Sequence, residues 1–563
     1  MSESVAGNTQ AVLVEDRRIA WSGETKFGVI KSGSQNTYVV LPTQTYSTSN
    51  FSFNAQPPAP NIAINREIFI RCQMTVTMTG TAGPSGTLLS IGTGDAPRFM
   101  PLAQITNSIS ATINNGNVSQ NNYQVVNALF RYNTPDNQYK TDLSVAPSMP
   151  DYYQNYDDNY VNGWGVVNDP LQAIGQTSQG WETRGGFPLD NVVNPNVGAG
   201  NPATASVTFT TTEPLILSPF LEGTDDHKAF IGVQVLTLNL NLTNLQRVWC
   251  HSLLNGNNGI INPATPGSVV VTFPTAPSLL LNFITPSAVD PIPAAVTYNY
   301  ANVDVYTTDP GSALAGLGTN TLPSQNIQLN TIPRRIYCFL RRRDNDSTLL
   351  TTDTFARINS VSINFDNTTG LLAGANSAQL YELSKNSGLN MSWAQWSTYT
   401  GSVLCLDMGR SIMLKNEAEA PSLQTTKQLQ IQVNYTNLNT NPVWFYLYIL
   451  VVSDGLMTIA NNATFLQNSV LSPGDITSAK ESGHVESWER ANTFYGGGFF
   501  KGLKKAVKKV AHHVNEGLKS TGIVSNALTT VSPQLGQVAS HFGYGREQHG
   551  GRRVSKAKLL TYR

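Results

Sequence analysis

The sequence predicts an all-β protein made of two tandem β-sandwiches, and three observations support this prediction. Segments with strand signals recur along the chain, separated by clusters of Gly, Pro, Asn and Asp. One strand–turn–helix pattern occurs twice. Charged residues make up only 13% of the 563 residues, against roughly 25% in an average soluble protein, while hydrophobic residues reach 40%. The chain therefore has enough apolar residues for a core, and its length fits about two to four domains.

The strand signals take two forms. In 231–242, apolar and polar residues alternate, as in a strand with one buried face. The segment 443–452 is a continuous apolar run, too short to span a bilayer and typical of a buried strand. The predicted strands cover residues 68–79, 205–212, 231–242, 267–273, 295–306, 336–340, 429–435 and 443–452.

Two segments have helical periodicity, and each follows a similar strand. Asn-Ser-Ile-Ser from Asn107 and Asn-Ser-Val-Ser from Asn359 begin the two units, 252 residues apart. The apolar residues that mark the helices are Val125, Val126, Leu129 and Phe130 in the first unit, and Leu380 and Leu383 in the second. This arrangement predicts an internal duplication, with chance similarity between Ser- and Asn-rich strands as the alternative.

The duplication divides the chain into two sandwiches of about eight strands and one helix each. The predicted organisation is an N-terminal arm (1–35), a first sandwich (36–254), a Pro- and Gly-rich linker (255–267), a second sandwich (268–490) and a tail (491–563).

The net charge of zero hides a division between body and tail. From Gly496 onward, twelve Lys and Arg stand against two Glu, so the tail carries +10 and residues 1–495 carry −10. A basic tail on an acidic body predicts an anionic partner, either nucleic acid or membrane. The N-terminus lacks the basic start and apolar run of a signal peptide, and the four Cys are far apart, so we expect an unsecreted protein in a reducing compartment.

Residues that suggest enzyme chemistry fit structural roles better. Asp225, Asp226 and His227 are adjacent and have no second ligand cluster, which favours a solvated turn over a metal site. His251 and His484 have no motif partner, and neither a G-x-S-x-G elbow nor a phosphate loop is present. We therefore predict no catalytic, cofactor or metal residues.

Five arginines bracket the predicted strand 336–340. They are Arg334, Arg335, Arg341, Arg342 and Arg343. Nucleic-acid binding is one interpretation, and pairing with carboxylates across a subunit contact is the favoured one.

The body, roughly residues 15–490, resembles the double-jelly-roll major capsid proteins of eukaryotic DNA viruses, of the polinton-like virus and virophage type. No segment is a catalytic signature, and the similarity lies in an ordered set of strand-level patterns. The segments that carry it are 16–21 (DRRIAW), 97–116 (PRFMPLAQITNSISATINNG), 213–221 (EPLILSPFL), 358–370, 401–409 (GSVLCLDMG) and 495–498 (YGGG).

The resemblance implies two tandem eight-stranded jelly rolls that stand perpendicular to a capsid surface. It also implies a homotrimer with a pseudo-hexagonal outline, which contacts neighbouring capsomers and minor (penton) capsid proteins in an icosahedral virion assembled inside the host cell. Two other classes remain open. One is a carbohydrate-binding or glycan-active β-sandwich, for which 151–158 (DYYQNYDD) is the one suggestive stretch. The other is a receptor-binding spike.

The start of the tail predicts a basic amphipathic helix. One helical face is apolar and the opposite face is basic, a pattern typical of a helix on a membrane or an anionic partner. Packing of the apolar face on the inner capsid wall is the alternative. The apolar face includes Phe499, Phe500, Leu503, Val507 and Val510, and the basic side includes Lys501, Lys504, Lys505, Lys508 and Lys509.

Two further features of the tail have functional interpretations. Arg552 and Arg553 belong to a second basic patch suited to neutralising packaged viral DNA. Gly497 and Gly498 precede the helix and resemble the sites that capsid proteases of related viruses cut, so we predict a candidate cleavage point there.

Overall fold

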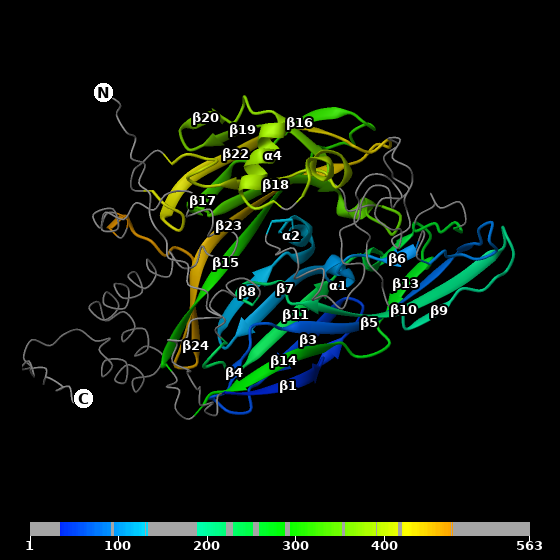
Figure 1. Cartoon of the computed structure of the whole chain (residues 1–563), viewed down its shortest axis with the longest axis horizontal. Helices are drawn as coiled ribbons and strands as arrows, with labels where there is room; N and C mark the ends of the chain where they lie inside the picture. The colour runs from blue at the N-terminus through cyan, green and yellow to red at the C-terminus, as the bar shows by residue number, and fades with distance from the viewer. Residues whose placement is uncertain are drawn as a thin grey trace, which may run out of the picture.

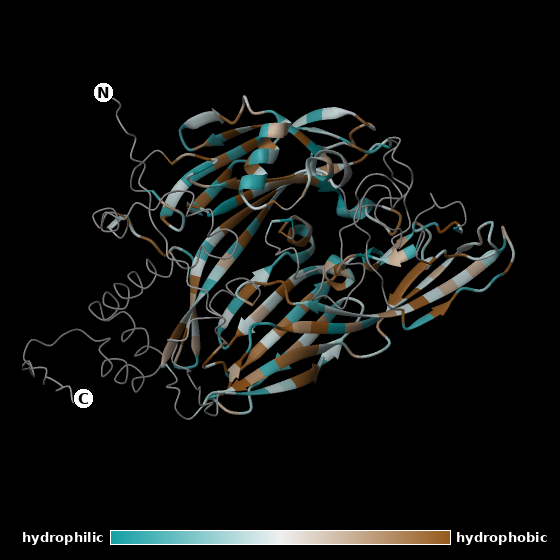
Figure 2. Ribbon diagram, in the orientation of Figure 1, coloured by the Kyte–Doolittle hydropathy of each residue, from teal (hydrophilic) through white to brown (hydrophobic). Residues whose placement is uncertain are grey.

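The computed structural model describes residues 34–91, 95–129, 131–132, 189–220, 229–251, 258–287, 293–351, 355–389, 391–414, 419–474 and 476. These residues form two β-sandwiches that lie one above the other in Figure 1. Figure 2 shows hydrophobic and hydrophilic residues alternating along many of the strands, as expected where one face of a strand is buried.

The first sandwich consists of two antiparallel sheets. One sheet has the order β1-β14-β5-β10-β9, with β13 also paired to β5 and β4 to β14, and the other has the order β2-β3-β11-β7-β8. Their strands are β1 (Gln35–Pro42), β2 (Thr45–Tyr46), β3 (Asn50–Ala55), β4 (Ala63–Ile64), β5 (Phe69–Thr81), β7 (Thr106–Ile113), β8 (Gly116–Gln120), β9 (Asn191–Val193), β10 (Pro202–Pro214), β11 (Leu236–Leu242), β13 (Val269–Thr272) and β14 (Ser278–Thr285).

The second sandwich repeats this plan. One sheet has the order β15-β23-β18-β21, with β24 also paired to β23, and the other has the order β16-β22-β19-β20, with β17 also paired to β22. The strands are β15 (Ala295–Thr308), β16 (Thr319–Pro323), β17 (Ile327–Thr331), β18 (Arg335–Arg342), β19 (Arg357–Phe365), β20 (Thr368–Leu371), β21 (Val403–Asp407), β22 (Gln424–Thr436), β23 (Phe445–Ala460) and β24 (Ala463–Gln467).

The main strands of the two sandwiches correspond. In each, the first strand (β1 or β15) pairs with a long strand from the end of the roll (β14 or β23), and the next two strands in that sheet are β5 and β10 or β18 and β21. The turns that follow β7 and β19 are built alike as well. Asn114 and Asp366, also 252 residues apart, both take a positive φ, of 54° and 53°, which short polar side chains tolerate. The structure therefore has the duplication that the sequence predicts.

Each sandwich buries the alternate residues of its long strands. In β5, the side chains of Ile70, Met74 and Val76 lie in the core, while Thr75 faces outward and bonds Thr208 of β10 at 2.8 Å. A one-residue slip would move every core side chain of the strand to solvent, so this pattern sets the register. The two-sheet plan confirms the predicted fold class of two tandem jelly rolls.

Two predicted boundaries are wrong. The sequence placed a linker at 255–267 and the second sandwich from 268, but β13 and β14 pair with β5 and so belong to the first sandwich. The division between sandwiches lies between Thr285 and Ala295, where β14 ends and β15 begins. The strand predicted from residue 231 begins only at Leu236, since Gly232 takes a φ of 78°, outside the extended region.

The two predicted helices are present as α2 (Asn122–Leu129) and α4 (Ser377–Asn386), although Phe130 lies outside the described residues. α4 begins with a capping box. The Asn376 side chain accepts from the Gln379 backbone N–H at 3.0 Å, and the Gln379 side chain accepts from the Asn376 backbone N–H at 3.0 Å. Two backbone donors that would be unpaired at the start of a helix are thereby satisfied.

A short buried helix that sequence analysis missed, α1 (Pro101–Ile105), precedes β7. The Glu213 carboxylate at the end of β10 accepts from the backbone N–H groups of Leu102 at 2.7 Å and Ala103 at 2.8 Å. Burial raises the pKa of Glu213 to about 7, although these hydrogen bonds oppose the rise. Glu213 thus ties α1 to β10, next to the place where the two rolls meet.

Candidate functional site at the junction of the two rolls

The core of each roll is completed by residues of the other. α2 follows β8 of the first roll and lies between the two rolls (Figure 1), and Val125 and Leu129 of this helix belong to the hydrophobic core of the second roll. In the opposite direction, Tyr298 of β15 and Met457 and Ile459 of β23 belong to the core of the first roll. We call the region where these residues meet the junction.

Buried arginines cross the junction and donate to backbone carbonyls. The Arg98 side chain is fully buried. It donates through Nε to Trp249 O at 3.1 Å in its own roll, and through Nη2 to Thr348 O at 2.9 Å and Thr351 O at 2.7 Å in the second roll. Thr348 and Thr351 lie in a loop rather than in a sheet ladder, so the planar guanidinium satisfies acceptors that would otherwise be buried without a partner.

Two further arginines act in the same way. Arg131, after α2, donates to Gly401 O at 2.8 Å and Thr400 O at 3.0 Å, and its guanidinium carbon lies 4.2 Å from the centroid of the Phe355 ring. Arg341 of β18 donates in the opposite direction, to Tyr123 O of α2 at 2.7 Å. Charge-assisted hydrogen bonds of this kind are stronger than neutral ones in a buried setting.

Tyrosine hydroxyls provide a second set of contacts between the rolls. The Tyr123 hydroxyl donates to the Asp344 carboxylate, and the Tyr132 hydroxyl donates to Val403 O. Burial, together with the nearby Asp344, raises the pKa of Tyr123 to about 12, and burial also raises the pKa of Tyr132. Both phenols therefore stay protonated and remain donors at physiological pH.

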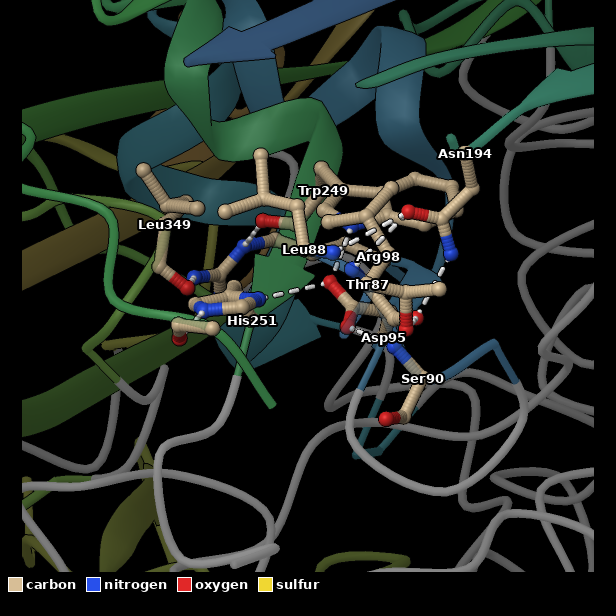
Figure 3. A network of polar contacts seen from close by, with 11 residues as sticks. Thr87, Leu88, Ser90, Asp95, Arg98, Asn194, Trp249, His251 and Leu349 are labelled. Carbon is tan, nitrogen blue, oxygen red and sulfur yellow. Dashed lines mark hydrogen bonds and ion pairs between the residues drawn. The ribbon is translucent and has the colours of Figure 1, made fainter. Parts of the chain in front are cut away.

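A polar network beside Arg98 holds β12 (Trp249–His251) against β6 (Asp95–Pro97) (Figure 3). The Asp95 carboxylate accepts from Trp249 Nε1 at 3.0 Å, from His251 Nδ1 at 2.8 Å and from the Ser90 backbone N–H at 2.9 Å. His251 Nε2 lies 3.0 Å from Gly259 O, so both ring nitrogens face oxygen acceptors and an imidazolium can donate to both.

The Asp95–His251 pair is structural rather than catalytic in its geometry. Both side chains have 0% exposure, so no substrate in solvent reaches them. The backbone N–H of His251 donates to Leu349 O of the second roll at 3.1 Å, which links this network to the junction. Within the described residues, no group of three or more His, Cys, Asp or Glu could hold a metal ion.

Three of the five arginines around β18 pair with carboxylates of their own chain, which corrects for these three the interpretation that they meet carboxylates across a subunit contact. Arg335 binds Asp407 of β21 at 2.8 Å, Arg334 binds Asp454 of β23 at 3.2 Å, and Arg343 binds Asp346 at 2.8 Å. Arg335 and Arg341 are buried inside the subunit, where no second chain can reach them.

Several residues named from sequence as candidate sites are not described by the structure. The possible cleavage point at Gly497 and Gly498, the tail residues from Phe499 to Arg553, the triplet 225–227 and the acidic stretch 151–158 all lie outside the described residues. No helix of the described part of the chain is long and apolar enough to cross a membrane.

Sequence reasoning missed the junction and the part that its residues have in it. Arg98 and Arg131 are single basic residues in apolar surroundings, and Asp95 and His251 are 156 positions apart. One signal was available, since Arg98 lies within the segment 97–116 that carries the family resemblance.

The fold and the shared core define the class of protein. The two jelly rolls are fused in tandem into one unit, with the strand order of the first roll repeated in the second. This architecture is that of double-jelly-roll capsid proteins. A chain in the cryo-EM structure of the Sputnik virophage is similar, with a TM-score of 0.73 and 30% identity over 87% of this chain and 99% of that one.

Sequence comparison identifies the family. The chain is 31% identical to the Sputnik virophage capsid protein V20 over 97% of both chains. Residues 7–284 match the family model for the first domain of the Sputnik virophage major capsid protein, and residues 303–400 match the model for the V20 C-terminal domain of the major capsid protein. The chain belongs to the virophage major capsid protein family.

The fold extends to a more distant relative. The crystal structure of the mavirus major capsid protein matches 84% of this chain and 98% of its own length, with a TM-score of 0.64 at 14% identity. At this identity the similarity concerns the fold alone.

The first family model ends at residue 284, which agrees with the observed end of the first roll at Thr285.

We predict that Arg98→Leu lowers the free energy of unfolding by about 3 kcal/mol or more, because buried carbonyls of both rolls lose their donor. Arg98→Lys should have an intermediate effect, since an ammonium keeps the charge but not the fork of donors. Denaturant unfolding of the purified chain measures both.

Lys385→Leu, at an exposed position on α4, serves as the control for loss of a positive charge. A free energy of unfolding for Arg98→Leu within about 0.5 kcal/mol of the wild type would contradict the role assigned to Arg98.

Proposed function

We propose that the chain is the major capsid protein of a virion, and that three copies associate into a capsomer that builds an icosahedral shell. The observation that carries this proposal is the pair of similar jelly rolls joined by a shared core, together with membership of the virophage major capsid protein family. Because each copy supplies two similar rolls, a ring of three copies presents six similar sides. Such an outline packs in a flat hexagonal array.

The proposed role is structural. The Asp–His pair that resembles part of a catalytic site is sealed inside the first roll, and the arginines of the junction bind carbonyls of the chain itself. We infer that the partners are neighbouring capsomers and minor (penton) capsid proteins, and that assembly takes place inside the host cell.

The tail is proposed to face the inside of the particle. Its basic residues would neutralise packaged DNA or bind an anionic membrane surface, and cleavage after Gly497 or Gly498 would release it from the body. The support is compositional, because the tail carries +10 while residues 1–495 carry −10.

We expect residues 1–495 to form the same trimer as the full chain. The final described strand, β24, ends at Gln467, so truncation at Tyr495 leaves every described strand of both rolls in place. Size-exclusion chromatography with light scattering should give the mass of three chains for both proteins. A folded monomer of the full chain would contradict the proposed capsomer, and a trimer of the full chain alone would assign trimer formation to the tail.

A peptide of residues 498–563 should bind duplex DNA, with affinity that falls steeply as salt is raised, or cause leakage of anionic vesicles. A matched peptide with Gln at Lys501, Lys504, Lys505, Lys508 and Lys509 should lose most of either effect, since the apolar face remains but the charges are gone. Equal behaviour of the two peptides would contradict an electrostatic role. Intact mass of the chain from purified virions tests cleavage independently.

A further inference from the structure

The two rolls are similar, so a contact between them within one chain indicates which equivalent surfaces could meet between two copies of the chain. β15 is the first strand of the second roll and β1 is the first strand of the first roll. In the same way, the loop between β21 and β22 corresponds to the loop between β10 and β11. Each surface of β15 that makes a contact within the chain therefore has an equivalent surface on β1.

Within the chain, β15 rests on the loop between β10 and β11. Tyr298 donates from its hydroxyl to Ala229 O at 2.9 Å and accepts from the Ile231 backbone N–H at 3.0 Å, while its ring meets the edge of Phe230 at 5.1 Å between centroids. Further along β15, the Ala301 backbone N–H donates to the Ser218 hydroxyl at 2.9 Å. The first strand of one roll is thus held by the β10–β11 loop of the other.

The counterparts of these two surfaces are uncovered. On β1, Tyr38 is 80% exposed and Val40 is 64% exposed, and on the β21–β22 loop Met413 is 74% exposed. Among the large apolar side chains of the described residues, Tyr38 and Met413 have the two highest exposed fractions. In Figure 1, β1 lies at the edge of the first roll that faces away from the second roll.

We propose that β1 of one copy docks on the β21–β22 loop of a second copy, with Tyr38 and Met413 in the contact. This inference rests on the proposed trimer and assigns its interface. The contact joins two different surfaces, so it is heterologous, and repetition around a three-fold axis closes a ring in which every β1 and every β21–β22 loop is covered.

The chemistry of the two surfaces fits a second copy of this chain as the occupant. β1 has the sequence QNTYVVLP and carries no charge, and on the loop Met413 is exposed beside the half-buried Leu414. The nearby Arg410 donates to Asn386 O of its own chain at 2.8 Å, so the contact that we assign to Tyr38 and Met413 is apolar. Tyrosine and methionine are enriched in the buried centres of protein interfaces. Val40 lies opposite Leu280 of β14, which extends the apolar surface onto the neighbouring strand.

Cysteine cross-linking tests the proposed contact directly. The native cysteines Cys72, Cys250, Cys338 and Cys405 are all buried, so an added exposed thiol reacts selectively. We expect Tyr38→Cys combined with Met413→Cys in the full chain to give covalent dimers and trimers with a short bis-maleimide on a denaturing gel. Each single variant should remain monomeric on the gel. Tyr38→Cys combined with Ile260→Cys, at an apolar position that is 62% exposed and outside both surfaces, is the matched control.

The outcomes separate this inference from the proposed trimer. Trimers in solution without cross-links in the double variant would overturn the inference and leave the proposed function intact. Covalent dimers from either single variant would overturn it too, since they indicate a symmetric contact. A monomeric wild-type chain by light scattering would overturn the proposed function itself. In support, Tyr38→Glu and Met413→Glu should each lower the trimer fraction, whereas Ile260→Glu should leave it unchanged.

Discussion

The structure depends on a core that the two rolls share. α2 begins in the first roll but completes the core of the second, and the ends of β15 and β23 complete the core of the first. Neither roll completes its core alone, because some of the side chains in each core come from the other roll. The hydrophobic effect that folds each sandwich therefore also fixes the angle between them. A capsid tile needs this rigidity, since variation in the angle between the rolls would change the outline of the capsomer.

Polar contacts specify how the shared core fits together. Arg98, Arg131 and Arg341 donate to backbone carbonyls across the junction, and Tyr123 and Tyr132 add hydroxyl donors that stay protonated. A hydrophobic surface tolerates small shifts, whereas a guanidinium with several carbonyl acceptors has one good position. Removal of the donor leaves buried acceptors unpaired, at a cost larger than the net gain of an average hydrogen bond. The hydrogen bonds of these arginines thus select one relative orientation of the two sandwiches.

Much of the fold could be predicted from the sequence, whereas the junction could not. Strands such as β5 and β23 could be predicted because their periodic or continuous apolar patterns lie within the strand itself. The duplication is visible in the two similar four-residue segments that begin at Asn107 and Asn359. The boundary was misplaced because the Gly- and Pro-rich segment at 255–267 is a loop inside the first roll. The two strands that follow it pair with β5, and nothing local to them reveals that partner. Arg98 and His251 have their partners through tertiary contacts far away in sequence, so no motif marks them.

The central claim is that the two rolls form one cooperative unit, and native-state hydrogen exchange under increasing denaturant tests it most directly. Amides in β5 of the first roll and β22 of the second, both central strands, report on the opening of each roll. The shared core predicts that both sets exchange through the same global opening, with equal free energies and equal dependence on denaturant. A lower opening free energy for one roll, with the other still protected, would show that each roll folds on its own and would contradict the account.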